Sequence, residues 1–319
     1  MTVPVISEML NSYPNLKISI ITKKHFTPLY SHLEKVNVIG VDFQSEYRGL
    51  LGLLKLSKKI KTLSIDFIAD LHNVLRTKIL KLFLFGYPFQ AINKARSDKK
   101  KLVQGKSFQP LKSTIERYAD VIRAFGLKLN LEHPKFPPPL VLSSSLKERI
   151  KINSKLLIGV APFAAYKSKI YPLDKMKKII NILSKDYTVV LFGGGKNETI
   201  ILDKIANQSK SIISFSGKFS MEEEIQIMSH LKLMISMDSG NAHMAAMMGV
   251  KVITLWGVTH PFAGFKPFNQ PLSNCLLSDR SAFPLIPTSI YGNIYPKNYE
   301  NAIASIPESE VLKAIKNNI

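Results

Sequence analysis

The residues best suited to chemistry lie at 238–243, where DSGNAH brings an Asp, a Ser and a His close together. Such a set fits a hydrolase nucleophile, a metal site or a phosphate cradle. A nucleophile is disfavoured because its elbow has a Gly two positions before the Ser, where Met237 stands. A metal is disfavoured because Asp238 and His243 lack the i, i+4 repeat or the second carboxylate of a known ligand set. We therefore expect a phosphate cradle.

The residues around this segment are typical of a strand that ends where a helix begins. The apolar run LKLMISM predicts a strand that stops at Met237, and the helix after it would close at Gly249. Ser239 is a preferred N-cap residue, and Gly240 lets a ligand approach the backbone. A helix N-terminus favours a phosphate because its first N–H groups are free. For His243, a structural role in capping or packing stays open.

Two further segments could support a phosphorylated ligand. In GVAPFAAYKSKIYP, Lys167 and Lys169 follow a strand and precede Pro172 at a predicted helix start, where a lysine suits a diphosphate as a point charge. Solvated lysines are the alternative. In LFGGGKNE the glycines form a turn, and Glu198 is placed to accept hydrogen bonds from a ribose or a base. The segment is not a P-loop, because GxxxxGK followed by Ser or Thr is absent.

These segments must be positioned by alternating strands and helices. Apolar runs predict strands, and amphipathic stretches between them predict helices, so each half of the chain has the pattern of an open parallel sheet. The expected fold class is α/β, with two doubly wound, Rossmann-like domains facing each other across a cleft. The expected strands are 15–22, 37–43, 64–73, 89–94, 155–163, 187–195, 211–217, 231–237 and 250–257, and the expected helices are 3–13, 75–86, 113–127, 173–185, 198–208, 221–231 and 307–317.

A proline-rich stretch separates the two series. EHPKFPPPLVLSSS, from 132 to 145, can neither continue a helix nor pair in a sheet. We expect domains at 1–140 and 150–319, and one possibility left open is that the C-terminal helix packs back on the first domain.

The charge of the chain is strongly basic and unevenly distributed. The net charge is +21, and residues 1–150 carry 25 Lys and Arg against 11 Asp and Glu, which is two thirds of the excess. Nucleic acid, anionic lipid and phosphorylated substrates are all attracted by such a field, and a merely solvated surface is the alternative. The single Cys275 excludes an internal disulfide and fits a reducing cytoplasm. No apolar run reaches the ~20 residues of a membrane-spanning helix, and the first residues lack the features of a secretory signal.

Taken in order, these segments resemble a known family. KSKIYP, GGGKNE and MDSGNAHMAAMMGVKVITLWG, each after a strand, resemble the nucleotide-sugar domain of glycosyltransferase family nine, whose best-known members are bacterial ADP-heptose:lipopolysaccharide heptosyltransferases. DFIADLHNVLRTKIL and ERYADVIRAFGL resemble the family as well, so that the resemblance covers nearly the whole chain.

The resemblance implies a GT-B fold and inverting transfer of a heptose or related sugar from an ADP-sugar to a lipopolysaccharide core or related glycan. It implies no metal and no cofactor for catalysis. The donor would be held by the second domain and the acceptor by the first. The implied donor-binding residues are Lys169 at the phosphates, Glu198 at the adenosine, and Asp238, Ser239, Gly240 and His243 around the diphosphate and sugar.

The acceptor implied by the resemblance is lipid-linked or phosphorylated, which gives the basic first half a use. Its candidate contacts are Asp70, His72, Lys94, Arg96, Lys99, Lys100 and Lys101. We expect a cytoplasmic protein with peripheral contact with an anionic membrane surface. Specific nucleic-acid binding is disfavoured, since no aromatic-basic interleaving and no known nucleic-acid fold is evident.

The chain departs from the family at one point. Relatives usually begin with a strand and a G-D loop that carries the proposed catalytic base, whereas this sequence starts inside the stretch that follows. We expect that strand and base to lie before Met1, and we leave the catalytic residue unassigned. Asp70 and His72 are titratable groups at a strand end, but an acceptor contact or a capping role at Asp70 is favoured. The competing hypothesis is a shortened, inactive relative that still binds a nucleotide sugar or an anionic glycolipid.

Overall fold

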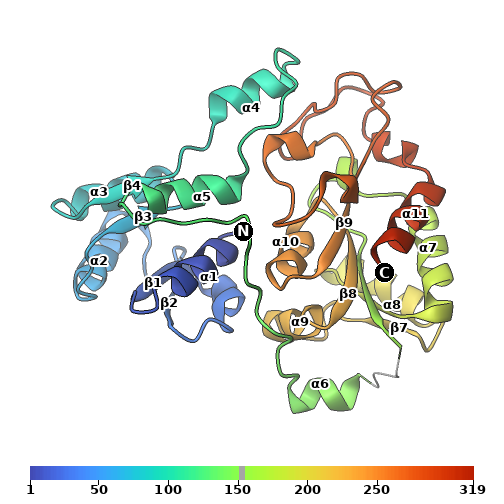
Figure 1. Cartoon of the computed structure of the whole chain (residues 1–319), viewed down its shortest axis with the longest axis horizontal. Coiled ribbons are helices and arrows are strands. Elements are labelled where there is room, and N and C mark those ends of the chain that lie inside the picture. The colour runs from blue at the N-terminus through green and yellow to red at the C-terminus, as the bar shows by residue number, and fades with distance from the viewer. Residues whose placement is uncertain (151–154) are drawn as a thin grey trace. The chain divides into compact units, whose positions relative to one another are not determined.

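The chain forms two compact α/β units in a computed structural model that describes residues 1–150 and 155–319 (Figure 1). The first unit comprises Met1–Ala95 and Lys112–Lys135, and the second comprises Arg96–Leu111 and Phe136–Ile319. The chain therefore passes to the second unit after Lys135, whereas the expected boundary lay between 140 and 150. Arg96–Leu111 joins the second unit through packing: the backbone N–H of Leu111 donates to the Phe262 carbonyl at 2.9 Å.

The first unit has two separate parallel ladders among its described residues, where the sequence predicted one doubly wound sheet. Strand β1 (Ile18–Lys23) pairs with β2 (Val36–Val41), and β3 (Ile68–Asp70) pairs with β4 (Phe89–Ala91). The ladder of β3 and β4 is short because each strand has three residues. Each ladder ends in a loop that carries charged side chains.

Helices on the first unit bury one face against these strands. Helix α2 (Gly49–Lys61) was not predicted, yet its buried Leu53, Leu56 and Ile60 recur at helical spacing and join one apolar cluster with Ile39 and Leu80. The remaining helices of this unit are α1 (Val3–Ser12), the 3-10 helix η1 (Lys24–Tyr30), α3 (Leu75–Phe83) and α5 (Thr114–Arg123).

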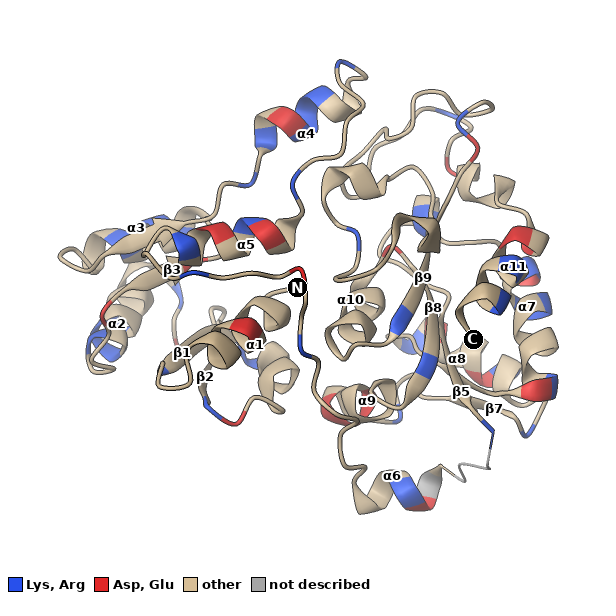
Figure 2. Cartoon of the chain, viewed as in Figure 1, with Lys and Arg blue, Asp and Glu red and all other residues tan. Residues whose placement is uncertain are grey.

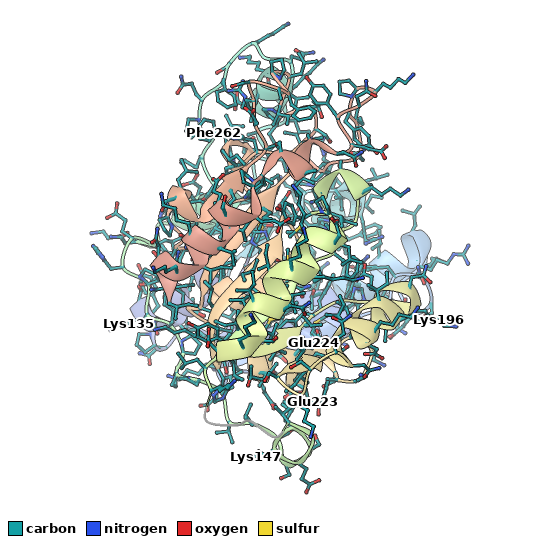
Figure 3. The ribbon with its side chains drawn as sticks, turned by 90° about the vertical axis from the view of Figure 1, so that its right-hand side faces the viewer. Lys135, Lys147, Lys196, Glu223, Glu224 and Phe262 are labelled. Atoms are coloured by element: carbon teal, nitrogen blue, oxygen red, sulfur yellow. The ribbon has the colours of Figure 1, made fainter. Side chains whose placement is uncertain are left out.

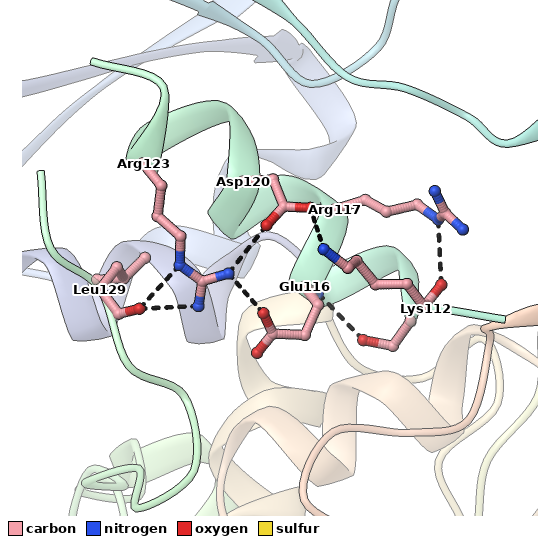
Figure 4. A network of polar contacts seen from close by, with 7 residues as sticks. Lys112, Glu116, Arg117, Asp120, Arg123 and Leu129 are labelled. Atoms are coloured by element: carbon pink, nitrogen blue, oxygen red, sulfur yellow. Dashed lines mark hydrogen bonds and ion pairs between the residues drawn. The ribbon is translucent and has the colours of Figure 1, made fainter. Parts of the chain in front are cut away.

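Helix α5 is held by a polar network that joins both of its ends (Figure 4). The Ser113 hydroxyl accepts from the Glu116 N–H at 3.1 Å, which caps the helix. At the other end the Arg123 guanidinium donates to the Leu129 carbonyl through two nitrogens, and to Glu116 and Asp120 through a third. The network fixes the chain that follows α5.

The second unit is built on a six-stranded parallel sheet. Its spatial order is β10-β9-β8-β5-β6-β7, and the strands are almost wholly buried, as expected for a sheet covered on both faces. The strands are β5 (Leu157–Ala161), β6 (Thr188–Leu191), β7 (Ile212–Ser214), β8 (Leu231–Met237), β9 (Lys251–Trp256) and β10 (Cys275–Leu277).

Three helices of the second unit change the expected picture. Arg96–Val103 forms helix α4, which was not predicted, and Ser144–Arg149 forms α6 between the two expected domains. Helix α11 (Glu308–Asn318) belongs to the second unit and contacts its α7 and β9. The other helices are η2 (Lys167–Lys169), α7 (Leu173–Asp186), α8 (Lys196–Ala206), α9 (Met221–Met228), α10 (Gly240–Met247), η3 (Pro261–Ala263), η4 (Leu272–Asn274) and η5 (Ala302–Ser305).

Helix α6 is attached to α9 by side-chain hydrogen bonds. Ser145 donates to Glu223 at 2.7 Å, and Glu223 also forms a capping box with Ser220 at the start of α9. Figure 3 labels Glu223, its neighbour Glu224, and Lys147 on α6. Burial raises the pKa of Glu224 to about 7. The proline-rich stretch is thus followed by an ordered contact with the second unit.

Candidate functional site

The predicted phosphate-binding segments meet at the point where the strand order of the second sheet reverses. From β5 the chain continues through β6 to β7 on one side, then returns to β8 on the other side of β5. In such sheets, ligands bind beyond the carboxyl ends of the strands at this switch point. The loop after β5 carries Lys169, and the loop after β8 carries Asp238. The topology therefore brings together residues that are 69 positions apart.

Lys169 and Asp238 form a buried ion pair at this switch point. Lys169 Nζ lies 3.1 Å from Asp238 Oδ2, and 11% of each side chain is exposed. The Thr259 hydroxyl donates to the same oxygen at 2.9 Å, and Thr259 is fully buried. Thr259 was not predicted as a site residue, because nothing in the sequence after β9 indicates that this side chain reaches Asp238. The ion pair and the hydrogen bond from Thr259 thus hold the Asp238 carboxylate and the Lys169 ammonium group in fixed positions.

A loop from the end of the chain holds the stem of Lys169. Ser168 donates to the Gly292 carbonyl at 2.6 Å. Gly292 has a φ of +91°, and a Cβ there would lie 2.8 Å from Lys169 Cγ and Cδ. Only glycine fits both the backbone conformation and the close approach. Ser168 and Gly292 were not predicted as site residues, since they lie far apart in the sequence and come into contact only in the folded chain.

The N-terminus of α10 lies next to this pair in the chain and is not capped by a side chain. Ser239 occupies the N-cap position, as predicted, but its hydroxyl lies 3.1 Å from the Ser236 hydroxyl and makes no capping hydrogen bond. No atom lies within 4 Å of the place where a Cβ on Gly240 would be. The first N–H groups of α10 therefore remain available to an anion.

His243 lies in the first turn of α10, and burial keeps its ring neutral. Its Nδ1 is buried without a hydrogen-bond partner among the described residues. Burial, with the nearby Lys169 charge as a smaller cause, lowers the pKa of His243 to about 3. His243 therefore has the packing role that the sequence left open, although a buried polar atom without a partner is uncommon in folded proteins.

Glu198 lies at the start of α8, in the turn after β6, and its carboxylate turns back on that turn. Its Oε2 accepts the Gly194 N–H at 2.7 Å, and its other oxygen makes no hydrogen bond among the described residues. Figure 3 labels Lys196 at the beginning of the same helix. The turn follows β6, the strand next to β5 in the sheet, and the nucleoside contact of Glu198 stays a prediction.

The expected acceptor contacts divide between the two units. Asp70, His72 and Lys94 belong to the first unit. Asp70 accepts the N–H groups of His72 at 2.9 Å and of Asn73 at 2.8 Å, so its carboxylate shapes the turn after β3. Burial, followed by the positive charge of Lys94, lowers the pKa of His72 below its usual value. Asp70 is therefore engaged in a local turn and does not cap α3, whose N-cap residue is Val74.

The other expected acceptor contacts lie on α4 in the second unit. Arg96, Lys100 and Lys101 are exposed there, while the Lys99 ammonium lies 4.2 Å from the centre of the Phe265 ring.

Two other kinds of feature are absent from the described residues. No group of three or more His, Cys, Asp or Glu is arranged to hold a metal ion. No helix has the length and apolar character of a membrane span.

The sequence matches one family along most of its length. A family model described as glycosyltransferase family 9 (heptosyltransferase) matches residues 53–286. Lipopolysaccharide heptosyltransferase 3 of Escherichia coli K12 is 24% identical over 291 residues, which is 85% of this chain and 82% of the relative. Lipopolysaccharide core heptosyltransferase OpsX of Haemophilus influenzae is 23% identical over 280 residues, 83% of this chain and 77% of the relative.

Solved structures with the same fold cover the chain almost completely. A family 9 glycosyltransferase from Veillonella parvula superimposes with a TM-score of 0.73 at 17% identity, over 99% of this chain and 92% of that one. The Escherichia coli heptosyltransferase WaaC, solved with ADP, superimposes with a TM-score of 0.70 at 14% identity. This superposition covers 100% of this chain and 95% of the WaaC chain. These likenesses confirm the predicted GT-B fold class. Because the family model also covers most of the chain, the protein belongs to glycosyltransferase family 9 and is a glycosyltransferase.

Proposed function

We propose that this glycosyltransferase moves a heptose or a related sugar, with inversion, from an ADP-sugar to a lipopolysaccharide core or related glycan. The names of its curated relatives support a heptose and a lipopolysaccharide acceptor, and the WaaC structure supports ADP as the nucleotide. The observation that carries the proposal is the buried pair of Lys169 and Asp238 beside the uncapped α10, at the switch point of the sheet.

The donor diphosphate would lie between Lys169 and the first turn of α10. The Lys169 ammonium group has donors beyond the one directed at Asp238, so it can also donate to a diphosphate oxygen. The N–H groups at the start of α10 can donate to a second oxygen. Asp238 would keep Lys169 aimed at the phosphates and stay within reach of a sugar hydroxyl. His243, with its Nδ1 buried, would support the first turn of α10 from within the unit.

The reaction that follows needs charge stabilisation more than a metal ion. The acceptor hydroxyl oxygen attacks the anomeric carbon from the face opposite the diphosphate, and the bond from that carbon to the phosphate oxygen breaks. The electron pair leaves with the diphosphate, where Lys169 and the α10 dipole oppose the new negative charge. The acceptor proton passes to a base, to which we assign no residue of this chain.

The nucleoside and the acceptor would use the remaining candidate residues. The second carboxylate oxygen of Glu198 would accept from the ribose, since the first is engaged with the glycine turn. On the first unit, His72 and Lys94 are the candidate contacts for a phosphorylated acceptor, because Asp70 is engaged in its own turn. On the second unit, the candidates are the exposed Arg96, Lys100 and Lys101 of α4, and Lys99 lies on the same helix.

The test is calorimetric titration of ADP and of ADP-sugars into Lys169→Met. We expect at least about tenfold weaker binding, because a charge-assisted contact to phosphate contributes about 1.5–3 kcal/mol. Lys167→Met is the matched control, since Lys167 lies two positions away and is exposed. Equal affinities for both variants would refute the donor site. Donor binding without any sugar transfer in the unmodified chain would favour the inactive relative instead.

A further inference from the structure

Two neighbouring helices of the first unit expose the most prominent apolar side chains of that unit. Leu51 on α2 is 83% exposed, and Leu75 and Leu82 on α3 are each 74% exposed. Phe85, directly after α3, is 92% exposed. Helices α2 and α3 pack against each other, so these side chains belong to one helical layer. Large apolar side chains at such exposure mark an interaction surface when they occur together.

On α3, Leu75 and Leu82 are exposed on a face opposite the buried Leu80. They lie seven positions apart, which is about two helical turns, and the exposed Lys78 lies between them on the same face. Phe85 lies in the turn after α3 and follows the same spacing. Core packing does not require this second apolar stripe, because α3 already buries Leu80. The stripe therefore faces away from the core of the unit and has no partner within the described part of the unit.

The same two helices are basic throughout. They contain the seven basic residues Lys55, Lys58, Lys59, Lys61, Arg76, Lys78 and Lys81, and no Asp or Glu. Figure 2 shows this run of basic positions along α2 and α3. Only Lys55 makes an ion pair among the described residues, with Glu46 outside the helix at 2.9 Å. The charge on the two helices is thus largely uncompensated.

We propose that the outer face of α2 and α3 docks onto an anionic lipid bilayer. Exposed Leu and Phe side chains enter the boundary between headgroups and acyl chains, while lysines contact the phosphates. Nucleic acid would use the lysines but would leave Leu51, Leu82 and Phe85 in water. An acidic protein partner would contact both the lysines and the apolar side chains. Binding of the chain to protein-free lipid vesicles would show that no such partner is needed. This proposal rests on the proposed function in one respect, because a lipid-linked acceptor is the reason for the protein to bind a membrane.

The test is co-sedimentation of the full chain with vesicles of phosphatidylcholine, with and without phosphatidylglycerol. We expect salt-sensitive binding to the anionic vesicles only. Lys58→Glu with Lys59→Glu should weaken it about thirty-fold or more, since each lysine near an anionic surface contributes about fivefold. Leu51→Ser with Phe85→Ser should weaken it about tenfold, because two inserted apolar groups are lost.

Matched pairs on the second unit serve as controls. Lys204→Glu with Lys210→Glu and Ile200→Ser with Leu272→Ser change exposed residues of the same types, and both should bind like the wild type. Equal losses in the control pairs, wild-type binding by the α2 and α3 variants, or no binding to anionic vesicles would each overturn the proposal. Calorimetry with ADP separates the two claims, because the α2 and α3 variants should keep donor affinity even if vesicle binding is lost.

Discussion

At the scale of single residues, the buried ion pair between Lys169 and Asp238 is expected to contribute little to stability, and the proposed donor binding would give it a function. Removing two charges from water costs several kcal/mol, and their attraction often only offsets that cost. A buried pair of this kind, with Thr259 as a third partner, keeps both groups in fixed positions. A charged ligand then finds its contacts already oriented, which lowers the entropy cost of binding.

His243 makes a prediction about stability and pH. Its folded pKa of about 3 lies below the ordinary value of 6.5, so between these pH values the unfolded chain binds a proton that the folded protein does not. The free energy of unfolding should therefore fall as the pH drops below about 6.5. Between pH 7 and pH 5, His243→Leu should lose about 2 kcal/mol less stability than the wild type in urea unfolding.

A histidine that is exposed provides the comparison for this prediction. His133 is exposed in the segment that ends the first unit, and His133→Leu should follow the wild type at both pH values. If His243→Leu lost as much stability on acidification as the wild type, the imidazole would not be held neutral by burial.

At the scale of elements, the N-terminus of α10 should respond to a single methyl group. A Cβ on Gly240 meets no protein atom, and alanine favours a helix over glycine by up to about 1 kcal/mol. Gly240→Ala should therefore keep or raise the unfolding temperature. The methyl group would occupy the space through which a phosphate approaches the N–H groups, so calorimetry should find weaker ADP binding. Unchanged ADP affinity in a stable Gly240→Ala variant would place the diphosphate elsewhere.

The strands of the second unit and the loops that carry Lys169 and Asp238 were predictable because their signals are local. Apolar runs such as 231–237, followed by small residues, indicate a strand end wherever they occur, and β8 does end at Met237. Helix α2 was not predictable in this way, because Gly49 and Gly52 weaken the helical pattern. In the structure Gly52 is required, since a Cβ there would lie 2.2 Å from the Tyr47 carbonyl carbon. The formation of α2 therefore depends on close packing around Gly52, which cannot be read from the sequence.

The polar partners within the site were only partly predictable, for the same reason. The chain order and the strand-end rule placed Lys169 and Asp238 in one site. Neither rule locates Thr259 or Gly292, whose contacts depend on how two distant loops fold over β5 and β8. Nor does the sequence show that the Ser239 hydroxyl lies against Ser236 in place of capping α10.

At the scale of the whole molecule, the uneven charge separates two kinds of binding. The net charge of +21 is concentrated in the first 150 residues, whereas the proposed donor site uses one lysine that is already paired with an aspartate. Exposed charges act over a distance and are screened by salt, but buried contacts are screened much less. Acceptor and donor should therefore respond differently to ionic strength.

We expect the KM for a phosphorylated acceptor to rise several-fold from low to physiological salt, while the KM for the donor changes little. Initial rates at varied acceptor and donor concentrations measure both. Lys100→Glu with Lys101→Glu on α4 should raise the acceptor KM at low salt and flatten its salt dependence, because fewer exposed charges remain to be screened. Lys204→Glu with Lys210→Glu removes the same charge from α8 and the loop after it and should behave like the wild type. A parallel rise in both KM values would mean that the basic first half and α4 do not select the acceptor.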